Sequence, residues 1–208
     1  MARHTGPVCR ICRREGMKLF LKGTRCDTPK CAFERRESAP GMHTSRRAKL
    51  TDYGIHVREK QKVKRYYGVL ERQFRKYFQM AQRSRAETGE ALMGLLERRL
   101  DNICHRMGFA LSRRQGRQLV SHGHVTVNGR RVDVPSYLVR VGDVVRVKNR
   151  PKSIEQVKLN LSVPGHEVPD FLTVVEGDQP EGHVVRLPEA ADVSIPVQTQ
   201  LIIELCSR

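Results

Sequence analysis

The fold is decided by the stretch SRRQGRQLVSHGHVTVNGRRV, residues 112–132. Its first half predicts a short helix, because Ser112 and Gln115 have the spacing of a capping box and Gly123 supplies a stop. Its second half has the alternating residue pattern of β-strands on both sides of an Asn-Gly pair at residues 128–129, and that pair suits a type I′ turn. We therefore expect a capped helix followed by a hairpin, at the heart of a small helix-plus-sheet domain.

The first turns of that helix are unusually basic. Arg113, Arg114 and Arg117 lie where the helix dipole is positive, which disfavours each cation by roughly 0.3–1 kcal/mol. An anion placed there would offset the cost, and a phosphate is the natural candidate. Solvated arginines on an exposed helix are the alternative.

Periodicity predicts further elements on both sides. A basic helix is expected over residues 51–67, ending at Gly68. A second helix should bury Leu70, Phe74, Tyr77, Phe78 and Ala81, and a third should run from Thr88 to Gly108 and bury Leu92, Leu96, Leu100, Ile103 and Met107. Strands are expected over 139–147, with a turn at residues 142–143, and over 171–175 and 184–187, while Cys104 and Cys206 should be buried thiols.

The charge of the 208-residue chain is large and uneven. There are 39 Lys and Arg against 22 Asp and Glu, a net charge of +17. Residues 1–76 carry +14, residues 77–152 carry +9 and residues 153–208 carry −6. Such a field attracts polyanions, so nucleic acid is the expected partner of the first three quarters of the chain.

The composition also narrows the kind of nucleic acid. Aromatic residues make up 5% of the chain and Trp is absent, which leaves few platforms for stacking single-stranded bases. We therefore expect recognition of folded, largely duplex nucleic acid through phosphates and shape. No run of 18 apolar residues is present, so no membrane partner is expected.

Four cysteines near the start have the spacing of a metal site: Cys9, Cys12, Cys26 and Cys31. Two such pairs can place four thiolates around one ion, which suits zinc, and an iron–sulfur cluster is the alternative. Reduced core cysteines are less consistent with the basic residues around them. A disulfide framework is disfavoured because no apolar signal segment precedes the cysteines, which points to a cytoplasmic location.

Glycines and a proline predict a knuckle made mostly of loops, followed by a linker over 37–44 and an exposed basic arm over 45–49.

These residues together resemble a known family. The helix and hairpin resemble the small RNA-binding module named after ribosomal protein S-four, on Ser112, Arg113, Arg117, Leu119, Val120, Gly123, Val125, Val127, Asn128, Gly129, Gly142 and Asp143. Residues 50–54, 58–62, 67–74 and 99–102 resemble the bacterial small-subunit ribosomal protein family itself, and the four cysteines resemble its zinc-binding branch. The resemblance covers nearly the whole chain.

The resemblance implies an α+β fold in three parts. These are a metal-binding knuckle and arm (1–45), an all-helical domain (46–92) completed by 188–208, and an inserted RNA-binding module with an antiparallel sheet (93–187). It implies a primary binder of small-subunit ribosomal RNA that clamps a helix junction and nucleates assembly, lies beside other ribosomal proteins in the cytoplasmic ribosome, and carries its arm near the point where messenger RNA enters. No small-molecule substrate is implied.

The candidate functional residues follow from the charge and the resemblance. The candidate RNA-binding residues are Arg46, Arg47, Lys49, Arg58, Lys60, Lys62, Lys64, Arg65, Arg72, Arg113, Arg114, Arg117, His122, Asn128, Arg130 and Arg131. No catalytic residue is among the candidates, because no constellation of nucleophile, base and orienting group is recognisable.

Two other classes of protein are possible. Pseudouridine synthases often carry the same module and use an Asp after Gly-Arg-Leu, and this chain has Arg99-Leu100-Asp101. About 60 residues follow the module, too few for a catalytic domain, so Asp101 is interpreted as a structural or salt-bridging carboxylate. A metal-finger DNA regulator would need a recognition helix after the cysteines, where Pro40-Gly41 stands instead.

Overall fold

The computed structural model describes residues 3–42, 49–165, 167–175 and 177–207. Arg46 and Arg47 of the predicted arm lie outside these ranges. The described residues form two compact units. The helical unit contains those up to Leu92 and those from Ile195 onward, and the sheet unit contains Met93–Ser194. The α+β class with an antiparallel sheet is confirmed.

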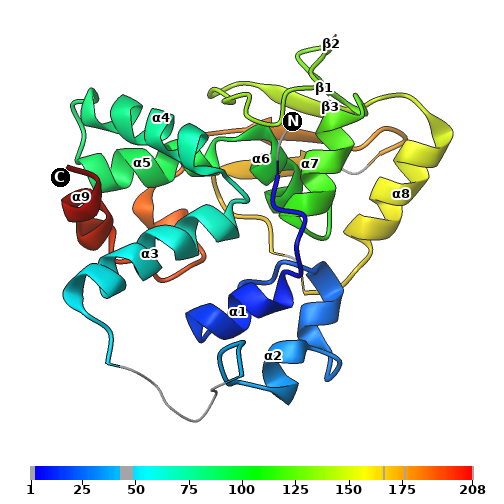
Figure 1. Cartoon of the computed structure of the whole chain (residues 1–208). Coiled ribbons are helices and arrows are strands. Elements are labelled where there is room, and N and C mark those ends of the chain that lie inside the picture. Colours follow the sequence, from blue (N-terminus) through cyan, green and yellow to red (C-terminus); the bar gives the residue numbers. More distant parts are fainter. Residues whose placement is uncertain (1–2, 43–48, 166, 176, 208) are drawn as a thin grey trace. The chain divides into compact units, whose positions relative to one another are not determined.

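The helical unit is built from short N-terminal helices and longer helices, which lie above them in the view of Figure 1. Its elements are α1 (Cys9–Glu15), the 3-10 helix η1 (Gly23–Asp27), α2 (Ala32–Arg35), α3 (Asp52–Tyr66), α4 (Glu71–Gln82) and α9 (Thr199–Ser207), and α5 (Thr88–Glu97) crosses into the sheet unit. The expectation of a knuckle made mostly of loops was wrong, because α1 forms before Gly16, η1 begins at Gly23 and α2 follows Pro29. Gly16, at φ +69°, ends the first of them.

The two longer helices follow the sequence pattern. Thr51 caps α3, since its Oγ1 accepts a hydrogen bond from the Gly54 N–H at 3.2 Å, and Gly68 follows the helix at φ +66°. Helix α4 buries Phe74, Tyr77, Phe78 and Ala81 as predicted. Leu70 is 37% exposed because it precedes the helix as its N-cap, so its assignment to the buried stripe was wrong.

The predicted long helix after Thr88 is two helices. Helix α6 (Leu100–Arg106) begins after Arg99, whose backbone is extended. The break has a backbone cause: the Arg98 carbonyl accepts from Val139 N–H at 3.0 Å, and Leu100 N–H donates to Tyr137 O at 2.9 Å. A neighbouring segment therefore takes the bonds that a continuous helix would use. The predicted apolar face is still buried, because α5 and α6 both turn it inward.

The sheet unit continues with α7 (Arg113–Ser121), β1 (Val125–Val127), β2 (Arg130–Arg131), β3 (Val144–Val147), α8 (Pro151–Leu161), β4 (Leu172–Val175) and β5 (Glu181–Val184). The strands form an antiparallel sheet in the order β2-β1-β3-β5-β4. The predicted hairpin is confirmed: Val127 pairs with Arg130, and Asn128 and Gly129 have φ values of 50° and 78°.

Two strand predictions were wrong in extent. Only residues 144–147 of the predicted pair 139–147 form a strand, because Asp143 closes a turn by accepting from Arg140 N–H at 2.8 Å. That turn leads into β3 and does not join two strands. The last strand is Glu181–Val184, earlier than the predicted 184–187, since its register is set by pairing with β3.

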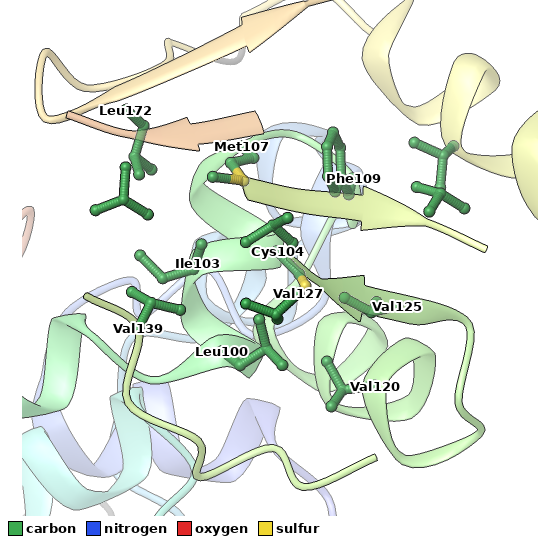
Figure 2. Close-up of a cluster of buried hydrophobic side chains, with 14 of the residues drawn as sticks. Leu100, Ile103, Cys104, Met107, Phe109, Val120, Val125, Val127, Val139 and Leu172 are labelled. Atoms are coloured by element: carbon green, nitrogen blue, oxygen red, sulfur yellow. The ribbon is translucent and has the colours of Figure 1, made fainter. Parts of the chain in front are cut away.

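The core of the sheet unit lies between the sheet and the pair α6 and α7. Figure 2 shows Leu100, Ile103, Cys104 and Met107 gathered with side chains from the strands, among them Val125. Helices α6 and α7 pack closely because Gly116 has no side chain; a Cβ there would lie 2.5 Å from the Asp101 carbonyl oxygen. Cys104 is fully buried, as predicted, and burial raises the pKa of its thiol. Cys206 is only partly buried, because it lies on the short terminal helix α9, so that prediction was wrong.

Candidate nucleic-acid interface

The arginines at the start of α7 lie above a buried polar network. Ser112 caps the helix by accepting from Gln115 N–H at 3.3 Å, while the Gln115 side chain accepts from Leu111 N–H at 2.9 Å, one residue before the predicted cap. Arg113 is 9% exposed, and its Nε donates to Asn102 Oδ1 at 2.8 Å. This guanidinium therefore has a partner inside the protein.

Asp101 is the carboxylate of this network. Arg99 Nε donates to its Oδ1 at 3.0 Å, and Arg117 Nη1 lies 3.5 Å from its Oδ2. Asp101 is 3% exposed and Arg99 is fully buried. The prediction of a salt-bridging role for Asp101 is confirmed, and part of the negative charge expected near the start of α7 comes from the protein itself.

A second carboxylate extends the network. Glu97 is fully buried, and its Oε2 accepts from Asn102 Nδ2 at 2.6 Å and from Arg106 Nε at 3.2 Å. The Asn102 amide thereby joins Glu97 to Arg113. Buried ions in such a network are stable only when they are paired. The pairing therefore allows charged residues to lie buried where α5, α6 and α7 meet.

A basic surface lies beside the hairpin, formed by His122, His124, Arg131, Lys148 and Arg150, and is called here the His124 surface. The pKa of His124 is held below its usual value, mainly by burial. The positive charges of its neighbours add to this effect, in the order Arg150, His122, Lys148 and Arg131. The imidazoles of His122 and His124 are 6.1 Å apart. A Cβ at Gly123 would lie 2.3 Å from Arg131 Nε, so the absence of a side chain lets this guanidinium cover the end of α7.

The cations of the His124 surface are poorly neutralised. Arg131 lies 3.7 Å from Asp133 Oδ2, and both side chains are more than half exposed. In the part of the chain that the structure describes, no carboxylate pairs with Lys148 or Arg150. Exposed, unneutralised cations on one surface are the electrostatic footprint of a phosphate-binding site.

The two predicted RNA-binding residues at the hairpin turn, Asn128 and Arg130, have different surroundings. Asn128 uses its side chain internally, donating to Asp143 Oδ1 at 2.8 Å and accepting from Val144 N–H at 2.9 Å. Arg130 is exposed on β2. Asn128 therefore shapes the turn, while Arg130 is available at the surface.

The basic residues of α3 are largely paired. Arg58 Nη1 lies 3.2 Å from Glu15 Oε1, while Lys60 and Lys64 reach Glu71 at 2.7 and 2.6 Å and Lys62 pairs with Glu59. Burial opposes the ionisation of Glu71, but the bonds from Lys60, Lys64 and Arg75 outweigh it and lower its pKa to about 2. Much of the basic charge on α3 therefore stabilises the helical unit.

The other predicted residues differ in exposure. Lys49 and Arg72 are exposed, Arg114 is half-buried, and Arg65 lines a cavity in the helical unit. Sequence reasoning missed His124, Lys148 and Arg150, although the run Lys148-Asn149-Arg150 directly after an expected strand was a usable signal. It also missed Arg10 and Arg14, which line the same cavity as Arg65.

The four predicted metal ligands lie in one neighbourhood. Cys12, Cys26 and Cys31 are buried and Cys9 is half-buried. Burial raises the pKa of Cys12, and the charges of the other three cysteines add to this effect, while a hydrogen bond with the backbone of Leu19 lowers it. Within the described ranges, no three or more His, Cys, Asp or Glu side chains are arranged to hold a metal ion. The donor chemistry fits a thiophilic metal, while the arrangement lacks a ligating geometry.

Comparison with known proteins gives matches along the whole chain. Residues 3–97 match the family described as ribosomal protein S4/S9 N-terminal domain, and residues 98–145 match the S4 domain. The small ribosomal subunit protein uS4 of Thermodesulfovibrio yellowstonii is 55% identical over 208 residues, and that of Thermoanaerobacter sp. is 56% identical over 208, each covering both chains completely. The uS4 protein of Acetivibrio thermocellus is 53% identical over 209 residues, again covering both chains completely. None of the helices in the described ranges is long and apolar enough to cross a membrane.

Proposed function

The chain belongs to the family of small ribosomal subunit protein uS4, and from this premise we propose that it is a primary binder of small-subunit ribosomal RNA that clamps a helix junction and nucleates assembly. It is a structural, non-enzymatic component of the small subunit, binds ribosomal RNA and neighbouring ribosomal proteins, and resides in the cytoplasmic ribosome. The observation that carries the proposal is a sequence identity above 50% with uS4 proteins over the full length of both chains.

The proposed contacts are electrostatic and geometric. The exposed cations Lys49, Arg72, Arg130, Arg131 and Arg150 would bind phosphates of different RNA helices. Within each unit, the paired cations of α3 and the buried network below α7 would hold the surrounding structure in place. The three-part division into 1–45, 46–92 with 188–208, and 93–187 is proposed as the domain organisation that presents these contacts.

The basic arm is proposed to serve a different RNA. Arg46 and Arg47, with Lys49, would lie near the point where messenger RNA enters the subunit. Three cations in five residues would bind a passing phosphate backbone without reading its sequence. Crosslinks from the arm to messenger RNA in initiated ribosomes would support this; crosslinks to ribosomal RNA alone would contradict it.

The cysteine cluster is proposed to hold zinc, with an iron–sulfur cluster as the alternative. The residues that would bind it are Cys9, Cys12, Cys26 and Cys31. A bound metal would stabilise their thiolates and cross-link a segment with little core of its own.

Chelation tests the metal proposal. Removal of the metal should cost the N-terminal segment its order while the sheet unit stays folded. Metal analysis of the purified chain and amide hydrogen exchange before and after chelation would measure this. A chelated sample with unchanged exchange over residues 9–35 and full RNA affinity would contradict the proposal.

The central experiment on function compares three ligands across a salt series. These are folded small-subunit ribosomal RNA, a DNA duplex of equal length and a single-stranded RNA. A preference for the folded RNA that persists at high salt, with a slope of roughly 0.7–0.9 per neutralised phosphate, is expected. Equal affinities that vanish together with salt would reduce the protein to a nonspecific polycation.

A further inference from the structure

The helical unit contains a cavity that the proposed contacts do not use. Its volume is about 510 Å³, within the range of roughly 300–1,000 Å³ typical of small-molecule sites. Its lining includes Arg10, Arg14, Glu15, Arg58, Gln61 and Arg65. These residues come from α1 and α3, two helices that pack together within the helical unit.

The charge of this cavity is unbalanced. Glu15 is the acidic residue among those lining it, and its carboxylate is engaged by Arg58 at 3.2 Å. Arg14 Nη2 donates to the Pro40 carbonyl at 2.9 Å, a bond that leaves its charge in place. The guanidinium groups of Arg10 and Arg65 have no partner among the described residues. The cavity therefore presents an excess of fixed positive charge to any anion that enters.

Gln61 adds a second, independent requirement. Its Oε1 is buried and receives no hydrogen bond from any described residue, although guanidinium donors line the same cavity. A buried acceptor left unpaired is costly, so a ligand that brings an O–H or N–H to this atom would remove the cost. Inorganic phosphate keeps one or two O–H groups at neutral pH and could satisfy both the arginines and Gln61, whereas the phosphodiester of RNA has none, so in RNA the donor must come from a sugar or a base.

A ribonucleotide meets both requirements, since it carries a phosphate together with sugar hydroxyls and base donors. We propose that the cavity receives one unpaired ribonucleotide of the bound ribosomal RNA, with its phosphate against Arg10 and Arg65 and a hydroxyl or amino group donating to Gln61. This rests on the proposed function and deepens it, by assigning the helical unit a nucleotide pocket in addition to surface contacts with phosphates.

The test compares charge-matched variants of the full chain. In the first, Arg10→Gln and Arg65→Gln are combined; in its control, Arg83→Gln and Arg85→Gln remove the same charge from exposed positions of the same unit. Binding to folded small-subunit ribosomal RNA should weaken at least roughly tenfold in the first variant, and the salt slope should fall by about 0.7–0.9, because the two arginines are proposed to neutralise one phosphate. The control should change neither quantity by a comparable amount.

Gln61→Glu separates folding from binding. A carboxylate among the arginines should leave the unfolding midpoint unchanged or raise it, yet it should weaken RNA binding by repelling the phosphate. Ultraviolet crosslinking of the wild-type complex should attach a nucleotide to peptides containing Arg10 or Arg65, and adenosine monophosphate alone should compete only weakly.

The outcomes distinguish the two proposals. If the Arg10 and Arg65 pair behaves as its control does while the wild-type chain still prefers ribosomal RNA to a DNA duplex, the pocket is wrong and the proposed function stands. If the wild-type chain shows no such preference, the proposed function fails and the pocket fails with it. Gln61→Glu binding RNA as tightly as the wild-type chain would also overturn the pocket.

Discussion

The sheet unit holds two groups of cations whose surroundings differ. Below α7, Arg99, Arg113 and Arg117 have carboxylate or amide partners and little exposure. At the His124 surface, Lys148 and Arg150 face no carboxylate among the described residues. Both groups belong to one basic stretch of sequence, so net charge alone does not tell which cations hold the fold and which remain for a partner.

The largest effect should come from removing the carboxylate that pairs the buried group. Asp101→Ala leaves the fully buried Arg99 without its carboxylate, and breaking a buried ion pair from one side costs about 3–5 kcal/mol. Urea unfolding of this variant would measure the loss. Asp133→Ala, at an exposed carboxylate, is the matched control and should change stability by less than about 0.5 kcal/mol. Equal effects of the two variants would show that the network does not stabilise the fold.

A smaller effect is expected from the guanidinium above that network. Arg113→Gln removes the donor to Asn102 in a nearly buried position, and the free energy of unfolding should fall by about 1–3 kcal/mol. Arg130→Gln, on the exposed strand β2, provides the comparison and should be nearly neutral. If Arg113→Gln left the free energy of unfolding unchanged, Arg113 would not be needed for the fold and would count among the cations available to a partner.

The paired cations of α3 should make stability depend on pH. The pKa of Glu71 is lowered to about 2, so its ion pairs stabilise the folded state above the unfolded pKa of about 4.3 and are lost as the pH falls toward 2. Because the Glu71 side chain is 37% exposed, screening reduces the contribution to about 1 kcal/mol.

Glu71→Gln tests this directly. The variant should be less stable than the wild-type chain at pH 7 by that amount, and the difference should vanish near pH 2. Unfolding by urea at both pH values gives the comparison. A difference that persists unchanged at pH 2 would mean that packing, and not charge, is responsible.

The sequence allowed prediction of elements whose signals are local. The cap at Ser112, the turn at Asn128 and Gly129, and the buried stripe of α4 each depend on neighbouring residues, and each is present. The break before α6 depends on backbone bonds from residues 137 and 139, distant in sequence, so helical periodicity across Arg99 concealed it. The sequence identified the basic residues of the candidate site. It did not show which of them are paired within the protein and which are available to RNA, because the partners of Arg113 and Lys60 come from other helices.

The most direct test of this distinction is the salt dependence of ribosomal RNA binding for Arg113→Gln and Arg150→Gln, measured side by side with the wild-type chain. Each variant loses one positive charge from the same unit. The account predicts that Arg150→Gln lowers the salt slope by about 0.7–0.9, while Arg113→Gln lowers stability and leaves the slope unchanged. Equal falls in slope for both variants would contradict it, because the paired arginine would then contact phosphate as fully as the exposed one.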